Sequence, residues 1–233
     1  MGSGSIRCLC HSTPCLCFWY DPLPRYHDYT TQQIQPSIIK ELGYTAAEAQ
    51  LLSVPPYAAA FVLTLIVAVL SEKTQRRAPF IMGSSILGCI GYIILLTDPR
   101  PGVSYAGTVF AAAGIYPAVA IVLSWPANNV SGQTKRAIAN AMQISIGNLG
   151  AVMGTQLYRT EYAPRYFVGH GVALGYLVAN VGVVSVLWWV LRRENANKAE
   201  IRQREGIHVE IGDISDEKNG FQGDRDPRWI FQT

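Results

Sequence analysis

The stretch LLSVPPYAAAFVLTLIVAVL, residues 51–70, decides the fold class of this chain. It contains no Asp, Glu, Lys or Arg. As a helix rising 1.5 Å per residue it would be about 30 Å long, which is the thickness of the hydrocarbon core of a bilayer. A charged side chain at that depth costs about 2.5–3.5 kcal/mol on insertion scales. We therefore predict a transmembrane helix here.

Four more charge-free windows of spanning length follow. The chain of 233 residues is 49% hydrophobic and only 15% charged, whereas a soluble protein is about 25% charged. A soluble all-α protein with buried helices is the alternative, but it has no need to avoid charge five times. We predict an all-α membrane protein with a five-helix transmembrane region over residues 51–193. The predicted spans are residues 51–70, 80–97, 103–125, 137–158 and 167–191.

The loop charges predict the orientation of these spans. Basic residues concentrate after the first, third and fifth spans, whereas the loops on the other side are poorer in Lys and Arg. Because Lys and Arg accumulate in cytoplasmic loops, we expect a multi-pass protein with a cytoplasmic C-terminus. The basic residues of the first two of these loops are Lys73, Arg76, Arg77, Lys135 and Arg136.

The regions flanking the spans are patterned differently. Residues 1–33 have no sustained apolar period, and we interpret them as a poorly patterned segment compatible with a wrongly assigned gene start. Residues 34–50 are predicted to be an extracellular amphipathic segment. Residues 194–233 mix both charges with Gly, Asn and Gln, which predicts a largely disordered cytoplasmic tail.

Cysteines near the start of the chain raise the question of a metal site. Cys8, Cys10, Cys15 and Cys17 lie close to His11, and such a set can bind zinc or copper(I). Their spacing is not that of a zinc finger, and it is equally compatible with disulfides or with arbitrary sequence. We predict no metal and no cofactor.

The fourth window carries the most informative polar pattern. Asn140, Gln143, Gly147, Gly150 and Gly154 recur at steps of three and four, which places them on one face of a helix. One interpretation is a helix-packing face, in which Gly150 and Gly154 form a GxxxG motif and amides hydrogen-bond neighbouring helices. The other is a helix that lines a polar pathway for a solute.

Other polar residues in the spans bear on the same question. Asn148 lies about a quarter turn from that face and is a further pathway candidate. Tyr116 is another pathway candidate, and it precedes Pro117 in the third window, where a proline bends the helix and frees a carbonyl. His170 is expected to be solvated at the outer end of the fifth span, because a proton relay needs titratable groups at depth.

The sequence disfavours several function classes. No nucleophile, base and orienting group occur together at plausible depth, and we find no phosphate-binding loop, so an enzyme is not expected and no catalytic residue is predicted. The net charge of +3 is too small and too scattered for nucleic-acid binding.

Residues 125–148, WPANNVSGQTKRAIANAMQISIGN, resemble the loop and helix that join the tenth and eleventh transmembrane segments of fungal major-facilitator transporters. The group is that of the anion:cation symporters, which includes allantoate and nicotinate permeases. The resemblance covers roughly residues 36–204. Its cytoplasmic-loop motif falls on Asn128, Asn129, Gly132, Lys135 and Arg136.

The resemblance implies that the five spans correspond to helices 8–12 of a twelve-helix fold, an incomplete C-terminal half. It implies symport of a proton with a small organic anion such as allantoate, nicotinate or a related vitamin, in the plasma membrane. Substrate binds between the two halves of such proteins, so the partners expected are the lipid bilayer and the missing N-terminal half. The alternative is a non-transporting five-span protein that associates with another membrane subunit.

Overall fold

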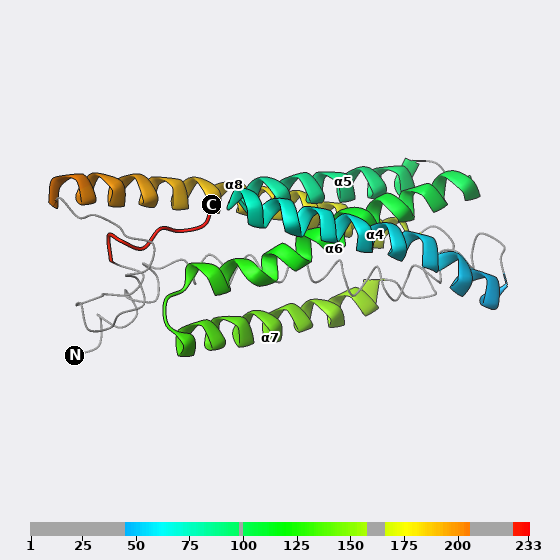
Figure 1. The fold of residues 1–233 in the computed structure, drawn as a ribbon. Helices are drawn as coiled ribbons and strands as arrows, with labels where there is room; N and C mark the ends of the chain where they lie inside the picture. The colour runs from blue at the N-terminus through cyan, green and yellow to red at the C-terminus, as the bar shows by residue number, and fades with distance from the viewer. Residues whose placement is uncertain (1–44, 98–99, 158–165, 206–225) are drawn as a thin grey trace.

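The computed structural model describes residues 45–97, 100–157, 166–205 and 226–233. Five long helices and no strand lie within these ranges: α4 (Ala46–Thr74), α5 (Ala78–Thr97), α6 (Pro101–Asn129), α7 (Gln133–Leu157) and α8 (Phe167–Glu205). Figure 1 shows α4, α5, α6 and α8 side by side, with α7 along one side of the group. The chain is an all-α membrane protein, as predicted. Residues 1–33 lie outside the described ranges.

The helices exist where the charge-free windows predict them, but each is longer than its predicted span. α4 begins after Thr45, whose hydroxyl accepts from the N–H of Glu48 while the Glu48 carboxylate accepts from the N–H of Thr45 at 3.0 Å. This capping box satisfies backbone groups that the start of a helix leaves unpaired. Residues 46–50 of the predicted 34–50 segment belong to α4, and residues 34–44 lie outside the described ranges, so the extracellular amphipathic segment stays a prediction.

Four of the five helices are long and apolar enough to cross a membrane. They are α4, α5, α6 and α8. α7 has 25 residues, enough to span a bilayer, but it lacks a stretch as apolar as those in the other four helices, and its first half carries Lys135, Arg136, Asn140 and Gln143. Among the described helices, α7 is thus the one that departs from a simple lipid-solvated span.

Helix α6 is the centre of the bundle, and glycines bring it close to α5. A Cβ added to Gly91 of α5 would overlap the backbone of Ala111, and one added to Gly114 of α6 would overlap the backbone of Gly88. Backbones approach this closely in membranes only where side chains are absent. We refer to this contact between Gly88, Gly91, Ala111 and Gly114 as the glycine seam.

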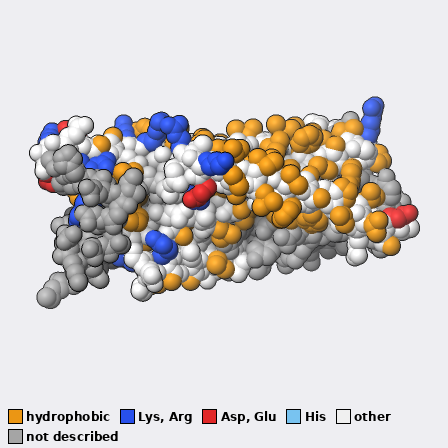
Figure 2. All heavy atoms as spheres, in the orientation of Figure 1, with side chains coloured by type: hydrophobic (Ala, Val, Ile, Leu, Met, Phe, Trp, Pro, Cys, Tyr) orange, Lys and Arg blue, Asp and Glu red, His pale blue; other side chains and the backbone are white. Residues whose placement is uncertain are grey.

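A belt of exposed apolar side chains surrounds the bundle. Leu51, Phe61 and Leu65 of α4 are each more than half exposed, and Figure 2 shows hydrophobic side chains covering one half of the visible face. A soluble protein rarely exposes an apolar surface of this extent, whereas lipid solvates it. Lys and Arg gather toward the other half of that face. We call the end where α4 and α6 stop and α5 starts the basic end.

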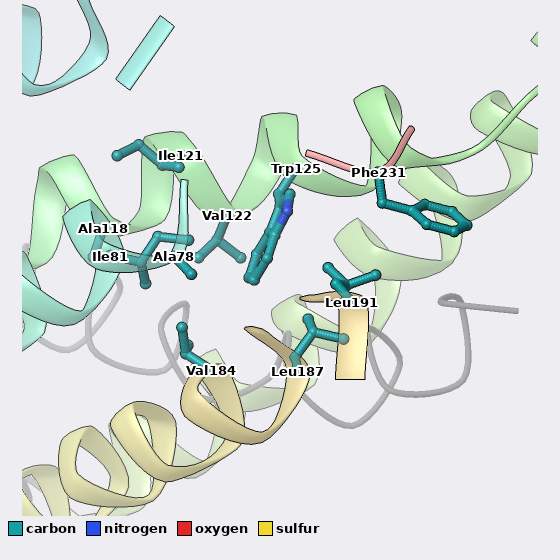
Figure 3. Close-up of a cluster of buried hydrophobic side chains, with 10 residues drawn as sticks. All are labelled: Ala78, Ile81, Ala118, Ile121, Val122, Trp125, Val184, Leu187, Leu191 and Phe231. Atoms are coloured by element: carbon teal, nitrogen blue, oxygen red, sulfur yellow. The ribbon is translucent and has the colours of Figure 1, made fainter. Parts of the chain in front are cut away.

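Residues 194–205 and 226–233 of the predicted tail have a defined structure, whereas residues 206–225 lie outside the described ranges, so the largely disordered tail stays a prediction. α8 continues to Glu205, and Glu200 and Arg204 form an ion pair one turn apart on this extension. Phe231 is 5% exposed and belongs to the same core cluster as Trp125 and Leu191 (Figure 3). Phe231 is thus buried in an apolar site at the basic end. The composition of the tail alone does not predict this contact.

Candidate functional site

Prolines free backbone carbonyls inside α4 and α6, and neighbouring helices supply the missing donors. Pro56 has no N–H for the carbonyl of Leu52, and the hydroxyl of Tyr105 on α6 donates to that oxygen at 2.9 Å. Pro126 likewise has no N–H for the carbonyl of Val122. That carbonyl accepts instead from the Gln143 side-chain amide of α7 at 3.1 Å. Interhelical hydrogen bonds in membranes contribute about 1 kcal/mol each, and these two bonds fix where α6 meets α4 and α7.

Gln143, predicted as a pathway candidate, is therefore also a packing residue. It is 5% exposed, and its Nε2 atom donates to the carbonyl of Val122. Asn140, one turn earlier, is half-buried, and its Oδ1 atom is buried without a hydrogen-bond partner among the described residues. Gly147 is buried, so Asn140, Gln143 and Gly147 share the face of α7 that is turned toward the bundle, as the spacing predicts.

The other predicted residues of α7 differ. Asn148 is exposed and does not share the buried face. Gly150 and Gly154 lie in α7, but their surroundings fall outside the description, so the GxxxG contact stays a prediction. The close backbone approach that is observed lies instead at the glycine seam.

Tyr116 lies half-buried on α6 and meets an aromatic partner that sequence reasoning missed. Its ring contacts Tyr57 of α4 edge to face, with ring centroids 5.8 Å apart. Edge-to-face geometry is a favoured arrangement of aromatic pairs. Val122, which Gln143 contacts, is six residues or about 9 Å further along the α6 axis. The predicted pathway residues thus occupy two levels of the bundle.

Two buried polar contacts connect α5 with α8. His170 is only 4% exposed and its ring lies 5.9 Å from that of Tyr92, so the expectation of a solvated histidine is wrong. Asn180 and Ser85 are fully buried and joined by a 3.0 Å hydrogen bond from Nδ2 to Oγ. Interhelical bonds of this kind hold membrane helices together. Neither contact has a sequence signal beyond a polar residue in an apolar window.

Comparison with known proteins identifies relatives of this chain. The chain is 36% identical over 180 residues, 77% of its length, to an uncharacterized transporter of Schizosaccharomyces pombe. It is 34% identical over 205 residues, 83% of its length, to an MFS-type transporter of Penicillium expansum. It is a homologue of fungal major-facilitator transporters. A third relative is the high-affinity nicotinic acid transporter of Saccharomyces cerevisiae, 31% identical over 169 residues, 72% of this chain.

The major-facilitator homologue spans less than two fifths of these relatives. The matches cover 37%, 39% and 32% of the three proteins, respectively. No family model matches the chain, and no solved structure matches it. The comparison thus gives the family without a template for the arrangement of the helices.

The loop motif of this major-facilitator homologue is mostly helical. Asn128 and Asn129 form the last turn of α6, and Lys135 and Arg136 lie in the first turn of α7. Gly132 between them has φ +89°, a conformation that L side chains rarely adopt, and its carbonyl accepts from the N–H of Arg136. The predicted loop is therefore only the three-residue turn 130–132.

Arg77, between α4 and α5, is a buried charge at the basic end. It pairs with Glu72 at 2.9 Å, donates to the Ser124 hydroxyl on α6, and donates through Nε to Gln232 at 2.8 Å. Burial lowers the pKa of the Arg77 guanidinium, and the Glu72 carboxylate opposes this by raising it. A guanidinium with three partners fixes the α4–α5 turn against α6.

Proposed function

We propose that the chain forms helices 8–12 of a fungal major-facilitator transporter that carries a small organic anion together with a proton across the plasma membrane. The most direct support is the alignment with a relative named as a nicotinic acid transporter, which covers 72% of this chain at 31% identity. Nicotinate, allantoate and related vitamins are the proposed substrate class. The proposed orientation, with the basic end in the cytoplasm, follows from the distribution of Lys and Arg.

The proposed pathway residues are Tyr116 on α6 and Asn140 and Gln143 on α7. Uncharged amides and a phenol hydrogen-bond a carboxylate without burying a second ion. Asn140 is the proposed donor, through its Nδ2 group, because it lies half-buried on the side of α7 that is turned toward the bundle. The charge-free windows hold no Lys or Arg, so the countercharge for the anion is proposed to come from the N-terminal half of the transporter.

A chimera tests this proposal. The matched region of the Saccharomyces cerevisiae nicotinic acid transporter is replaced by this chain, and uptake of labelled nicotinate and allantoate is measured at pH 5 and pH 7. We expect uptake above background that is faster at pH 5, and loss of uptake in Asn140→Leu but not in Ser145→Ala, a control on the exposed side of α7. A chimera that reaches the cell surface and takes up neither compound would contradict the proposal.

A second candidate is a non-transporting protein that binds another membrane subunit. The exposed face of α4 favours it, because the membrane-spanning window of this helix is the least buried of the four. Cysteines introduced in place of Val62 or Leu65, both about half exposed, would form adducts with a protein partner in native membranes. Adducts with lipid-soluble reagents alone would exclude a protein partner on this face.

A further inference from the structure

The end of the tail is held at the basic end by two asparagines that contact its main chain. Asn129, the last residue of α6, accepts from the N–H of Gln232 at 2.7 Å and donates to the carbonyl of the same residue at 3.2 Å. A side-chain amide that pairs with both main-chain groups of one residue imitates the pairing of a neighbouring β-strand.

Asn195 of the α8 extension repeats this arrangement one residue earlier. Its Oδ1 atom accepts from the N–H of Phe231 at 3.0 Å, and its Nδ2 atom donates to the Phe231 carbonyl at 2.9 Å. In an extended segment the main-chain groups of successive residues point to opposite sides. α6 and α8 thus each bind the main chain of this segment through one asparagine, from opposite sides.

Side-chain contacts add an anchor to these main-chain bonds. Phe231 is 5% exposed, and the ammonium of Lys198 lies 4.1 Å from the centre of its ring. The indole N–H of Trp125 donates to the Gln232 carbonyl at 2.9 Å, and the N–H of Arg77 donates to the Thr233 oxygen at 2.8 Å. By contrast, Ile230 is 54% exposed. The site therefore buries Phe231 as its anchor and binds the main chain of residues 231–233, and Arg77 and Gln75 also hydrogen-bond the Gln232 side chain.

We propose that the basic end is a peptide-binding site whose ligand is residues 226–233 of the same chain. Its occupancy clamps together the α4–α5 turn through Arg77, the end of α6 through Trp125 and Asn129, and the α8 extension through Asn195 and Lys198. The clamp makes these three elements move as one body, which a half that rocks as a unit requires. This role goes beyond the proposed transport function and does not depend on the substrate.

Residue-resolved hydrogen exchange on the full chain in lipid nanodiscs tests occupancy of the site. We expect the amides of Phe231 and Gln232 to exchange at least ten-fold more slowly than those of Ile230 and Thr233, because only the former pair donates to an asparagine. Uniform exchange at the rate of a free peptide across residues 230–233 would overturn the proposal, and this readout needs no variant.

Variants test which side chains make the site. Asn129→Leu and Asn195→Leu remove the amide pairs with little change in volume, and we expect each to speed exchange at Phe231 and Gln232 roughly ten-fold. The matched controls are Asn128→Leu on α6 and Asn197→Leu on the exposed side of α8. Equal protection in test and control variants would refute the assignment of the two asparagines.

The clamp itself is tested across helices. Asn195 lies on α8, so in Asn195→Leu we expect faster exchange also near the end of α6, at residues 125–130, which the substitution does not touch. Unchanged exchange at α6 despite release of Phe231 and Gln232 would refute the clamp. The result is readable without any transport assay, so it stands apart from a failure of the proposed function.

Discussion

The α5–α6 contact and the α6–α7 contact are opposite solutions to holding two membrane helices together. The glycine seam brings backbones together over apolar, side-chain-free surface, whereas α7 meets α6 at a polar bond from Gln143 to a carbonyl that Pro126 frees. The α5–α6 contact depends on the absence of side chains at the glycine seam, so no larger residue can replace these glycines. The α6–α7 contact depends on one hydrogen-bond donor and one acceptor. A rigid seam suits a scaffold, and a single directional bond suits a helix that is to move or to meet solute.

The largest expected effect comes from breaking the glycine seam. In Gly114→Ala the new methyl group meets the backbone of Gly88, which cannot move aside as a side chain would, and we expect a loss of more than about 3 kcal/mol of stability. Thermal denaturation in detergent measures this loss. Gly102→Ala, where nothing lies within 4 Å, is the matched control and should behave as the parent protein.

Phe231→Ala addresses a third kind of contact, a side chain from a distant segment in the core. Removing the buried ring should weaken docking of the tail by about 2 kcal/mol. Trypsin cleavage after Arg228 reports the docking, because the bond becomes accessible when the tail leaves. Ile230→Ala, the exposed neighbour, should leave the cleavage rate unchanged; equal acceleration in both would mean that the ring is not the anchor.

Gln143→Leu tests the polar contact of α7. The carbonyl of Val122 loses its side-chain donor, and we expect a cost of about 1 kcal/mol, the size measured for interhelical bonds in membranes. Hydrogen exchange along α7 should rise while α5 and α6 keep their protection. Ser145→Ala is the control, since its hydroxyl bonds only within its own helix at the carbonyl of Ala141. A loss as large as that of Gly114→Ala would remove the distinction between the two contacts.

The smallest effect is expected for Glu72→Gln at the basic end. Glu72 is largely exposed, so its pair with Arg77 should contribute about 0.5 kcal/mol at low salt and less at high salt. Because this carboxylate raises the pKa of the buried Arg77 guanidinium, the substitution should lower that pKa further. Unfolding measured at low and at high salt checks the result, and a difference between parent and variant that is equal at both salt concentrations would argue against a Coulombic pair.

The membrane class and the approximate positions of the helices could be predicted from the sequence. A helix in contact with lipid has to exclude charged residues over about 20 positions, whereas a helix of a soluble protein rarely does. The helix ends could not be predicted in the same way. The capping box of Thr45 and Glu48 starts α4 among polar residues, before the charge-free window begins. Pro56 and Pro126 mark two acceptors, Leu52 and Val122, but nothing in the sequence identifies Tyr105 or Gln143 as their donors.

The face of α7 was predictable for a different reason. A period of three and four residues fixes which side chains share a side, and Asn140, Gln143 and Gly147 do share one. Docking of the tail was not predictable, because residues 229–231 form only a short apolar run in a charged segment. The partners of this run and of Gln232 lie on three separate elements.

The length of α8 gives the protein a lever. Its 39 residues extend about 58 Å, roughly twice the thickness of the hydrocarbon core, with Arg192 and Arg193 stacked on Trp188 and Trp189 near the fulcrum. A change of about 5° in its tilt about that point displaces the far end by about 2 Å. Because Asn195 and Lys198 on this extension hold the end of the tail, a tilt of the membrane-spanning part of α8 is passed on to the aqueous ends of α4, α5 and α6.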